Sequence, residues 1–412
     1  MSRRRLDVLS SDFFPAYVVW ELTLRCDLAC RHCGSRAGPA RPEELSTSEA
    51  LAVVEQLAAL GAREVVLIGG EAYLHEGFLE IVAALKAAGV TATMTTGGRA
   101  VDAALARRMV EAGLSRVSVS VDGLEATHDR MRGLRGSFAA AMAAVEHCGA
   151  AGLEVAANTN LNRLNQGDLE GLYERLRPHV RAWQLQITTP LGRAADRTDM
   201  LLQPWDLLEL LPRVAALKRR AFEAGVLIMP GNNLGYFGPE EGLLRSLRPE
   251  GRDHWLGCQA GRFVMGIESD GGVKGCPSLQ SAAYVGGKLR EQSLARIWER
   301  APELAFTRSR SVEDLWGFCR SCPFAATCLG GCSFTAHAVL GRPGNNPYCH
   351  YRARDFAKRG LRERLVPGEP APGRPFDNGL FEIVVEALDA PDPGVAHTPE
   401  QLVKITRRPG GS

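Results

Sequence analysis

The sequence predicts an α/β fold in which a parallel sheet curves into a partial barrel and a smaller, cysteine-rich domain follows. Between residue 17 and about residue 230, amphipathic helical segments end at a glycine and are followed by short apolar segments. This alternation is typical of βαβ units, whose strands pair in parallel with right-handed crossovers. Six or seven such strands suit a partial barrel better than a closed barrel of eight.

The helix-ending glycines mark where each unit turns back to the sheet. Glycine suits the position after a helix because it adopts the left-handed conformation at little cost. These glycines are Gly61, Gly89, Gly113, Gly152 and Gly225. The strands are expected at residues 17–22, 64–68, 90–95, 116–121, 153–158, 183–188 and 226–229. A capping box, Ser46 with Glu49, marks the start of the helix that follows the first strand.

Length and composition leave room for one large domain and a smaller one, and they exclude several classes of protein. The 412 residues are 45% hydrophobic and 23% charged, which is ordinary for a globular chain. With 49 basic and 47 acidic residues, the net charge of +2 gives no general attraction to nucleic acid or to a membrane. No apolar run has the roughly 18 residues of a membrane span, and the N-terminus lacks the apolar core of a secretory signal. We therefore expect a cytoplasmic protein that binds neither nucleic acid nor a membrane. In the cytoplasm, eleven cysteines favour metal binding over disulfides.

Three cysteines follow the first expected strand directly. Cys26, Cys30 and Cys33 have the spacing C-x3-C-x2-C, in a loop at the carboxyl end of the strand, where parallel α/β sheets bind ligands. Thiolates are the usual ligands of iron–sulfur clusters, which need four, so three local cysteines leave one iron open. Buried cysteines or a zinc site are less favoured alternatives, because zinc normally takes paired C-x2-C units closed to four ligands.

Glycines and polar residues follow the other expected strands, at the same edge of the sheet. Two glycines allow the backbone to approach a ligand closely, and a glutamate after them can accept from an ammonium group. The strand-end residues are Gly69, Gly70, Glu71, Thr96, Ser120, Asp122 and Asn158, with Arg132 in the loop after the fourth strand. Each of them alone fits a turn or a cap, but together behind the cysteine triplet they predict a ligand site.

The triplet and the Gly69-Gly70-Glu71 turn resemble the signature of the radical S-adenosylmethionine (SAM) enzymes, and so does His32 before the last cysteine. The resemblance implies a partial (β/α)6 barrel whose 4Fe–4S cluster binds SAM at its open iron. One electron from that cluster would cleave SAM to methionine and a 5′-deoxyadenosyl radical, which abstracts hydrogen from the substrate. It also implies that Glu71 binds the amino group of SAM, that Ser120 meets its ribose or carboxylate, and that Arg132 pairs with its carboxylate.

Seven further cysteines lie between residues 258 and 349. They are Cys258, Cys276, Cys319, Cys322, Cys328, Cys332 and Cys349. One zinc site would use four of them, whereas two cluster sites would use seven or eight. Their spacing, C…G-x4-C…C-x2-C-x5-C-x3-C…C, resembles the SPASM domain, an extension of radical SAM enzymes that carries two auxiliary clusters.

The resemblance also implies how these cysteines divide between the two auxiliary clusters. Its outer cluster would take Cys319, Cys322, Cys328 and Cys349, and its inner cluster would take Cys258, Cys276 and Cys332. Fully ligated relatives have a fourth inner cysteine where this chain has Val264, so the inner cluster has an open iron or takes a ligand from elsewhere. Cys148 has no partner at metal spacing and is expected to be a buried apolar residue.

These motifs divide the chain into an N-terminal segment (1–16), the barrel (17–235), the auxiliary-cluster domain (236–355) and a C-terminal linker and tail (356–412). Residues 231–239 are turn-rich and form either a substrate loop or a linker. Beyond the cysteines, we expect a solvated helix end at 358–364, an extended linker at 367–375, a strand at 380–387 and a loose tail over the last twenty residues.

The sequence therefore predicts a radical SAM/SPASM enzyme with SAM, one SAM-binding cluster and two auxiliary clusters as cofactors. The first hypothesis for its reaction is oxidative modification of a ribosomally synthesised peptide by crosslinking, epimerisation or side-chain oxidation, with an electron donor such as flavodoxin or ferredoxin. The second is small-molecule or cofactor biosynthesis, such as side-chain removal on a tetrapyrrole. The third is a non-catalytic electron carrier, which would need no SAM pocket. The sequence assigns no catalytic residue and names no substrate.

Overall fold

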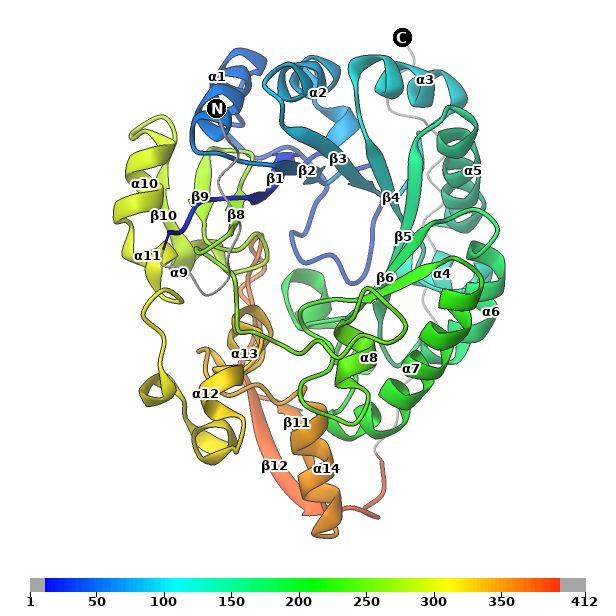
Figure 1. Ribbon diagram of the computed structural model, residues 1–412, viewed down its shortest axis with the longest axis vertical. Coiled ribbons are helices and arrows are strands. Elements are labelled where there is room, and N and C mark those ends of the chain that lie inside the picture. The colour runs from blue at the N-terminus through cyan, green and yellow to red at the C-terminus, as the bar shows by residue number, and fades with distance from the viewer. Residues whose placement is uncertain (1–11, 393–412) are drawn as a thin grey trace.

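A computed structural model describes residues 12–392 of the chain, and its main feature is a curved sheet with helices on the outside (Figure 1). The parallel strands are β1 (Tyr17–Thr23), β2 (Glu64–Gly69), β3 (Thr91–Thr96), β4 (Arg116–Ser120), β5 (Glu154–Leu161), β6 (Ala182–Ile187) and β7 (Leu227–Pro230). From β1 to β7 the order in the sheet follows the order in the chain. The predicted partial barrel is confirmed, and no strand end is shifted by more than three residues.

Helices connect these strands and flank the sheet (Figure 1). They are α1 (Thr47–Ala59), α2 (Phe78–Ala87), α3 (Ala103–Ala112), α4 (Glu125–Arg132), α5 (Ser137–Ala150), α6 (Leu169–Leu176) and α7 (Leu207–Glu223). All of them except α4 contribute buried apolar residues to the main hydrophobic core. The five predicted helix-ending glycines all have a positive φ, between 72° and 102°. The capping box of Ser46 and Glu49 is present at the start of α1. These helix boundaries are therefore set by local sequence.

The cysteine-rich region extends the same sheet beyond β1. Its strands are β8 (Val264–Ile267), β9 (Gly272–Lys274) and β10 (Val285–Lys288), and β8 lies parallel to β1. Strands β8 and β9 form an antiparallel hairpin, and Gly271 between them has a φ of 84°. A partial barrel leaves one edge of its first strand open, and β8 satisfies the backbone groups of that edge.

The remaining α-helices and strands of the described residues lie between residues 241 and 387. They are α8 (Glu241–Arg245), α9 (Ser281–Tyr284), α10 (Leu294–Arg300), α11 (Pro302–Ala305), α12 (Ala325–Cys328), α13 (Ser333–Leu340), α14 (His350–Lys358), β11 (Leu361–Pro367) and β12 (Phe381–Ala387). Within residues 12–392, no helix combines the length and the apolar character that crossing a membrane requires.

The C-terminal region differs from its sequence-based description. A strand at residues 380–387 is confirmed as β12, but the solvated helix end expected at 358–364 is wrong beyond α14. Instead, β11 pairs with β12 in an antiparallel ribbon at one end of the molecule (Figure 1). The charged residues of β11 suggested solvent exposure in the sequence. In the structure, Arg362 and Arg364 both bind Glu386 across the ribbon. The tail expected over the last twenty residues lies outside the described residues.

Arg352 ties the ribbon to the cysteine-rich region through buried charge. Its guanidinium donates to both carboxylate oxygens of Glu363 on β11, at 2.6 and 2.7 Å, and to Oδ1 of Asn345 at 2.6 Å. The side chains of Arg352 and Glu363 are 3% and 4% exposed. Such a bidentate pair depends on both partners, because either charge alone would be buried without compensation.

We expect Glu363→Gln to lower the free energy of unfolding by about 3–5 kcal/mol, since Arg352 would remain charged and buried. Glu313→Gln is the matched control, because its contact with Arg320 spans 3.6 Å between side chains that are 84% and 60% exposed. We expect this control to cost less than about 1 kcal/mol. Urea unfolding of the cluster-loaded protein measures both values, and equal costs would contradict the role given to the buried pair.

Candidate active site and metal centres

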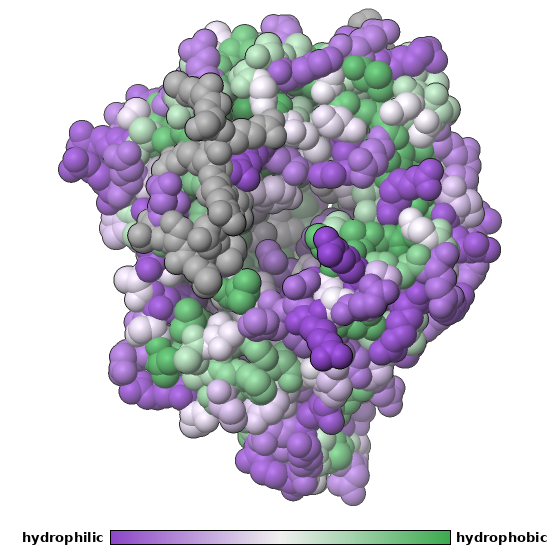
Figure 2. All heavy atoms as spheres, viewed as in Figure 1, coloured by the Kyte–Doolittle hydropathy of each residue, from purple (hydrophilic) through white to green (hydrophobic). Residues whose placement is uncertain are grey.

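The carboxyl ends of the barrel strands and the loop after β1 enclose a cavity of about 290 Å³. It lies inside the curve of the sheet, where Figure 2 shows the molecule hollowed. The predicted residues that line it are Cys26, Cys30, Cys33, Gly69, Gly70, Glu71, Thr96, Ser120, Arg132 and Asn158. The structure thus brings the cysteine triplet and the strand-end residues to one place. Asp122 lies behind the wall of the cavity and is fully buried.

The cysteine triplet sits in a loop that hydrogen bonds hold in place. The N–H of Cys26 donates to the carbonyl of Gly38 at 2.9 Å, and Nε of Arg193 donates to the carbonyl of Cys30 at 2.8 Å. Burial raises the pKa of the Cys26 thiol, and Glu71 and the other two cysteines raise it further. Thiolates this close together need positive charge between them, which iron supplies. The donor set therefore fits an iron–sulfur cluster.

Glu71 lies beside the triplet with its carboxylate held by β3. It accepts a hydrogen bond from Oγ1 of Thr96 at 2.5 Å and another from the N–H of Gly97 at 2.7 Å. Its nearest ligand atom lies within 4.8 Å of the sulfur of Cys26. Burial raises the pKa of Glu71 to about 8, while the bond from Thr96 lowers it. An ammonium group next to this carboxylate would favour its charged form.

The two glycines before Glu71 also have a packing role that the sequence did not indicate. A Cβ atom at Gly69 would lie 2.1 Å from the carbonyl oxygen of Thr23, and one at Gly70 would lie 2.2 Å from that of Arg25. The backbone that approaches closely here is the start of the cysteine loop, and both glycines also line the cavity. These glycines therefore allow β2 to pack against the loop that carries the triplet.

Asp122 organises the wall between β4 and the triplet. Its Oδ2 lies 2.6 Å from Nη2 of Arg132 and 3.1 Å from Nε2 of His32. Burial alone would raise the pKa of Asp122, but Arg132 and His32 lower it below its ordinary value. Arg132 also donates to the sulfur of Cys30 at 3.4 Å. The predicted contact of Asp122 with the cofactor is therefore replaced by a positioning role, because its carboxylate is already occupied by these two side chains.

Other polar groups face the cavity from β5, β6 and the loop after β7. Oδ1 of Asn158 is buried and has no hydrogen-bond partner among the described residues. Gln186, Thr188 and Asn233 also line the cavity, although they were not among the predicted site residues. The alternation of polar and buried residues along β6 could have indicated Gln186. Asn233 belongs to the segment 231–239. Its Oδ1 accepts a hydrogen bond from the N–H of Ile187 at 3.0 Å, and its Nδ2 donates to the carbonyl of Ile187 at 2.7 Å.

The four cysteines expected to hold the outer cluster surround one small cavity. Cys319, Cys322, Cys328 and Cys349 line it together with the aromatic rings of Phe237, Phe318, Phe324 and Tyr351. Burial raises the pKa of Cys328 to about 12, and the thiols of Cys319 and Cys322 add to this rise. Four thiols around one enclosed, largely apolar space fit a fully ligated cluster.

The three cysteines expected to hold the inner cluster also lie together. Burial raises the pKa of Cys276 to about 12, and Cys258 and Cys332 raise it further. Ser278 and Phe334, each two residues after one of these cysteines, line the main cavity. The inner set is therefore next to that cavity, whereas Val264 at the expected fourth position begins β8.

Comparisons with known proteins agree with this arrangement. The family described as the Radical SAM superfamily matches residues 20–176, and an iron–sulfur cluster-binding domain, SPASM, matches residues 258–323. Mycofactocin maturase MftC of Mycobacterium ulcerans is 31% identical over 348 residues, which cover 81% of this chain and 88% of that protein. AdoMet-dependent heme synthase of Nitratidesulfovibrio vulgaris is 28% identical over 82% of this chain and 92% of that protein. The structure of Streptococcus suis SuiB bound to S-adenosylmethionine has a TM-score of 0.64 at 17% identity, covering 78% of this chain and 73% of that one.

The ligand assignments stay predictions, which iron counting tests. We expect C26A/C30A/C33A to lose about four iron atoms per chain and about four sulfides, out of about twelve of each, because one 4Fe–4S cluster loses its ligands. Cys148→Ala is the control, since Cys148 is buried in α5 and its pKa is raised to about 11 by burial alone. Elemental analysis and electron paramagnetic resonance of the reduced protein measure the result. An unchanged iron content in the triple variant would contradict the assignment of Cys26, Cys30 and Cys33 as cluster ligands.

Thr96→Val tests the carboxylate at Glu71. It removes the 2.5 Å hydrogen bond that lowers the pKa of Glu71, so less of the carboxylate is charged at neutral pH. We expect SAM to bind about tenfold more weakly, as measured by equilibrium dialysis. Thr93→Val on the same strand is the control, because Thr93 bonds Glu64 away from the cavity and should leave SAM affinity unchanged. Equal affinity in both variants would contradict the role of Glu71.

Proposed function

Because the chain belongs to the radical SAM superfamily and carries a SPASM domain, we propose that this enzyme oxidatively modifies a ribosomally synthesised peptide. Its cofactors are SAM, a SAM-binding 4Fe–4S cluster and auxiliary clusters. When bound, these groups supply reductive cleavage of SAM and remove an electron from the substrate. The chain's own residues bind, orient and enclose the reactants.

The observation that supports an oxidative reaction is the position of one cavity between two cysteine sets. Glu71 and the triplet line one part of it, and Ser278 and Phe334, next to the inner cysteines, line another. A substrate in this cavity would lie between the site of SAM cleavage and an electron acceptor. Electron removal after hydrogen abstraction requires an electron acceptor near the substrate.

Three side chains prepare the SAM end of the cavity. Glu71 is oriented by β3 to accept from the amino group of SAM. Arg132 faces the same cavity, and Asp122 fixes its guanidinium at 2.6 Å. Both carboxylates are buried, so water does not compete for these contacts.

The relatives support a peptide substrate, and they also support a second candidate. MftC is named a maturase, the Rhizobium meliloti relative is named PqqA peptide cyclase, and SuiB has been solved with its precursor peptide SuiA. Other relatives are named AdoMet-dependent heme synthase and Fe-coproporphyrin III synthase. Side-chain chemistry on an iron tetrapyrrole is therefore the second candidate. A carrier of electrons without catalysis is not favoured, since these relatives are synthases, cyclases and maturases.

The protein would work in a reducing compartment. Reduced clusters and free thiolates persist in the cytoplasm, where we place the protein. An electron donor such as flavodoxin or ferredoxin would supply the electron for SAM cleavage.

The test is an anaerobic assay of the protein loaded with iron and sulfide. We expect 5′-deoxyadenosine after addition of SAM and dithionite, and a precursor peptide encoded beside this chain's gene should become lighter by about two hydrogens. Iron coproporphyrin III is incubated in parallel and followed by absorbance and mass. A changed porphyrin with an unchanged peptide would replace the first candidate by the second. No 5′-deoxyadenosine with either compound would remove the proposed function.

A further inference from the structure

Glu21 on β1 is a buried carboxylate with one oxygen in use and one free. Its Oε1 accepts from Nε of Arg41 at 2.8 Å and from the hydroxyl and N–H of Ser269 at 3.0 and 3.2 Å. Its Oε2 has no hydrogen-bond partner among the described residues. Glu21 is 2% exposed and lines the main cavity.

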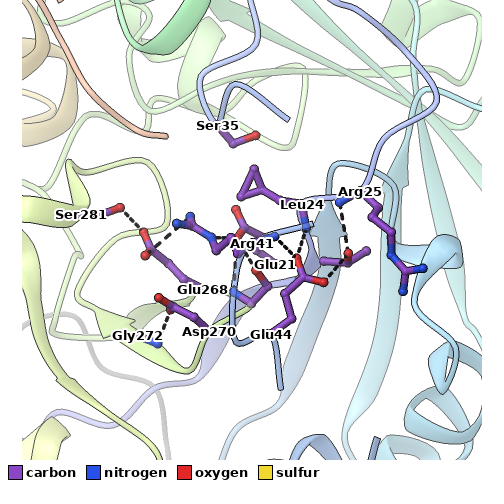
Figure 3. Close-up of polar contacts among 12 residues, drawn as sticks. Glu21, Leu24, Arg25, Ser35, Arg41, Glu44, Glu268, Asp270, Gly272 and Ser281 are labelled. Atoms are coloured by element: carbon purple, nitrogen blue, oxygen red, sulfur yellow. Dashed lines mark hydrogen bonds and ion pairs between the residues drawn. The ribbon is translucent and has the colours of Figure 1, made fainter. Parts of the chain in front are cut away.

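The carboxylates around Glu21 differ from it in this respect. Figure 3 shows Glu44, Glu268 and Asp270 in the same polar cluster, which joins β1 to the loop after β8. Glu44 accepts bonds on both oxygens from residues 23, 24 and 41. Glu268 contacts Ser281 and Arg41 through its two oxygens, and Asp270 contacts Gly272 and Lys288. Oε2 of Glu21 is thus the unfilled acceptor of the cluster.

Each cation near the cavity already has at least one partner within the protein. Arg132 contacts Asp122, and Arg193 donates to the carbonyls of Cys30 and Ala37. Lys274 lies 2.7 Å from Glu268, and the ring of Phe376 covers its ammonium group at 3.9 Å. The buried polar atoms without a hydrogen-bond partner here include two donors, Nη2 of Arg41 and Nε of Arg132, and one carboxylate acceptor, Oε2 of Glu21. A buried acceptor without a partner costs folding free energy, which a bound donor recovers.

We propose that Glu21 is a substrate-recognition residue whose Oε2 accepts a hydrogen bond from an N–H group of the substrate. This inference rests on the proposed peptide function and narrows it, because amide and guanidinium groups are such donors. An iron tetrapyrrole offers this oxygen no N–H, since the metal replaces the pyrrole protons, and its carboxylates would be repelled. Glu21 therefore favours a peptide over an iron tetrapyrrole in this cavity.

The first test uses butylguanidinium as a probe on the anaerobic, SAM-loaded holoenzyme, with binding followed by calorimetry. We expect one site per chain, with affinity at least about tenfold weaker in Glu21→Gln because the charge-assisted bond is lost. Asp270→Asn is the matched control and should keep the wild-type affinity, since both oxygens of Asp270 are occupied and it does not line the cavity. Iron content per chain reports whether each variant is folded.

The outcomes separate this inference from the proposed function. Equal affinity in wild type and Glu21→Gln, or no binding to the wild type, overturns the role of Glu21. If Glu21→Gln does not fold, Glu21→Asp decides, because it keeps a charge beside Arg41 but withdraws the free oxygen and should also weaken binding. With the precursor peptide that the wild type modifies as substrate, Glu21→Gln should raise KM about tenfold with little change in kcat. An unchanged KM overturns the recognition role of Glu21 and leaves the proposed function intact. If the wild type does not modify the peptide, the proposed function is overturned, and the butylguanidinium result alone decides the role of Glu21.

Discussion

Strand β1 forms hydrogen bonds along both of its edges, and this double pairing determines where each site lies. Its residues Tyr17–Trp20 pair with β2 on one side and with β8 on the other. A strand paired on both sides cannot shift its register without breaking two ladders. The triplet follows its carboxyl end, Glu21 lies within it, and the cysteine-rich region connects through β8. One strand therefore positions the triplet, the inner cysteines and the recognition residue relative to one another.

Buried negative charge is the second constraint. Burial raises the pKa of the Cys26 thiol and Glu71 raises it further, and the two auxiliary sets contain more thiols whose pKa burial raises. Among the acids near the triplet, Asp122 is balanced within the protein, through Arg132 and His32. The other groups need the iron of the clusters and the ammonium group of SAM. Cofactor binding should therefore contribute to stability as well as to chemistry.

Several elements could be predicted because their causes are local. The left-handed glycines after helices and the Ser46–Glu49 capping box act within a few residues, and both are found where expected. Strand β11 could not be predicted in this way. Its charged residues suggest solvent exposure, yet Arg362 is buried because Glu386, far along the chain, lies opposite it. The role of Gly69 was also hidden, since the carbonyl of Thr23 that it meets belongs to another strand.

The sequence by itself determined the chemistry available to this protein, because the kind and spacing of ten cysteines specify sulfur donors in sets. It also determined the order of the barrel strands, since each helix and turn returns the chain to the neighbouring position. The tertiary structure decided which groups face one another. It placed Asp122 behind the cavity instead of in it, and it brought Ser269 to one oxygen of Glu21 across 248 positions of sequence while leaving the other free. Such contacts depend on sheet register and packing between distant segments, which local spacing does not encode.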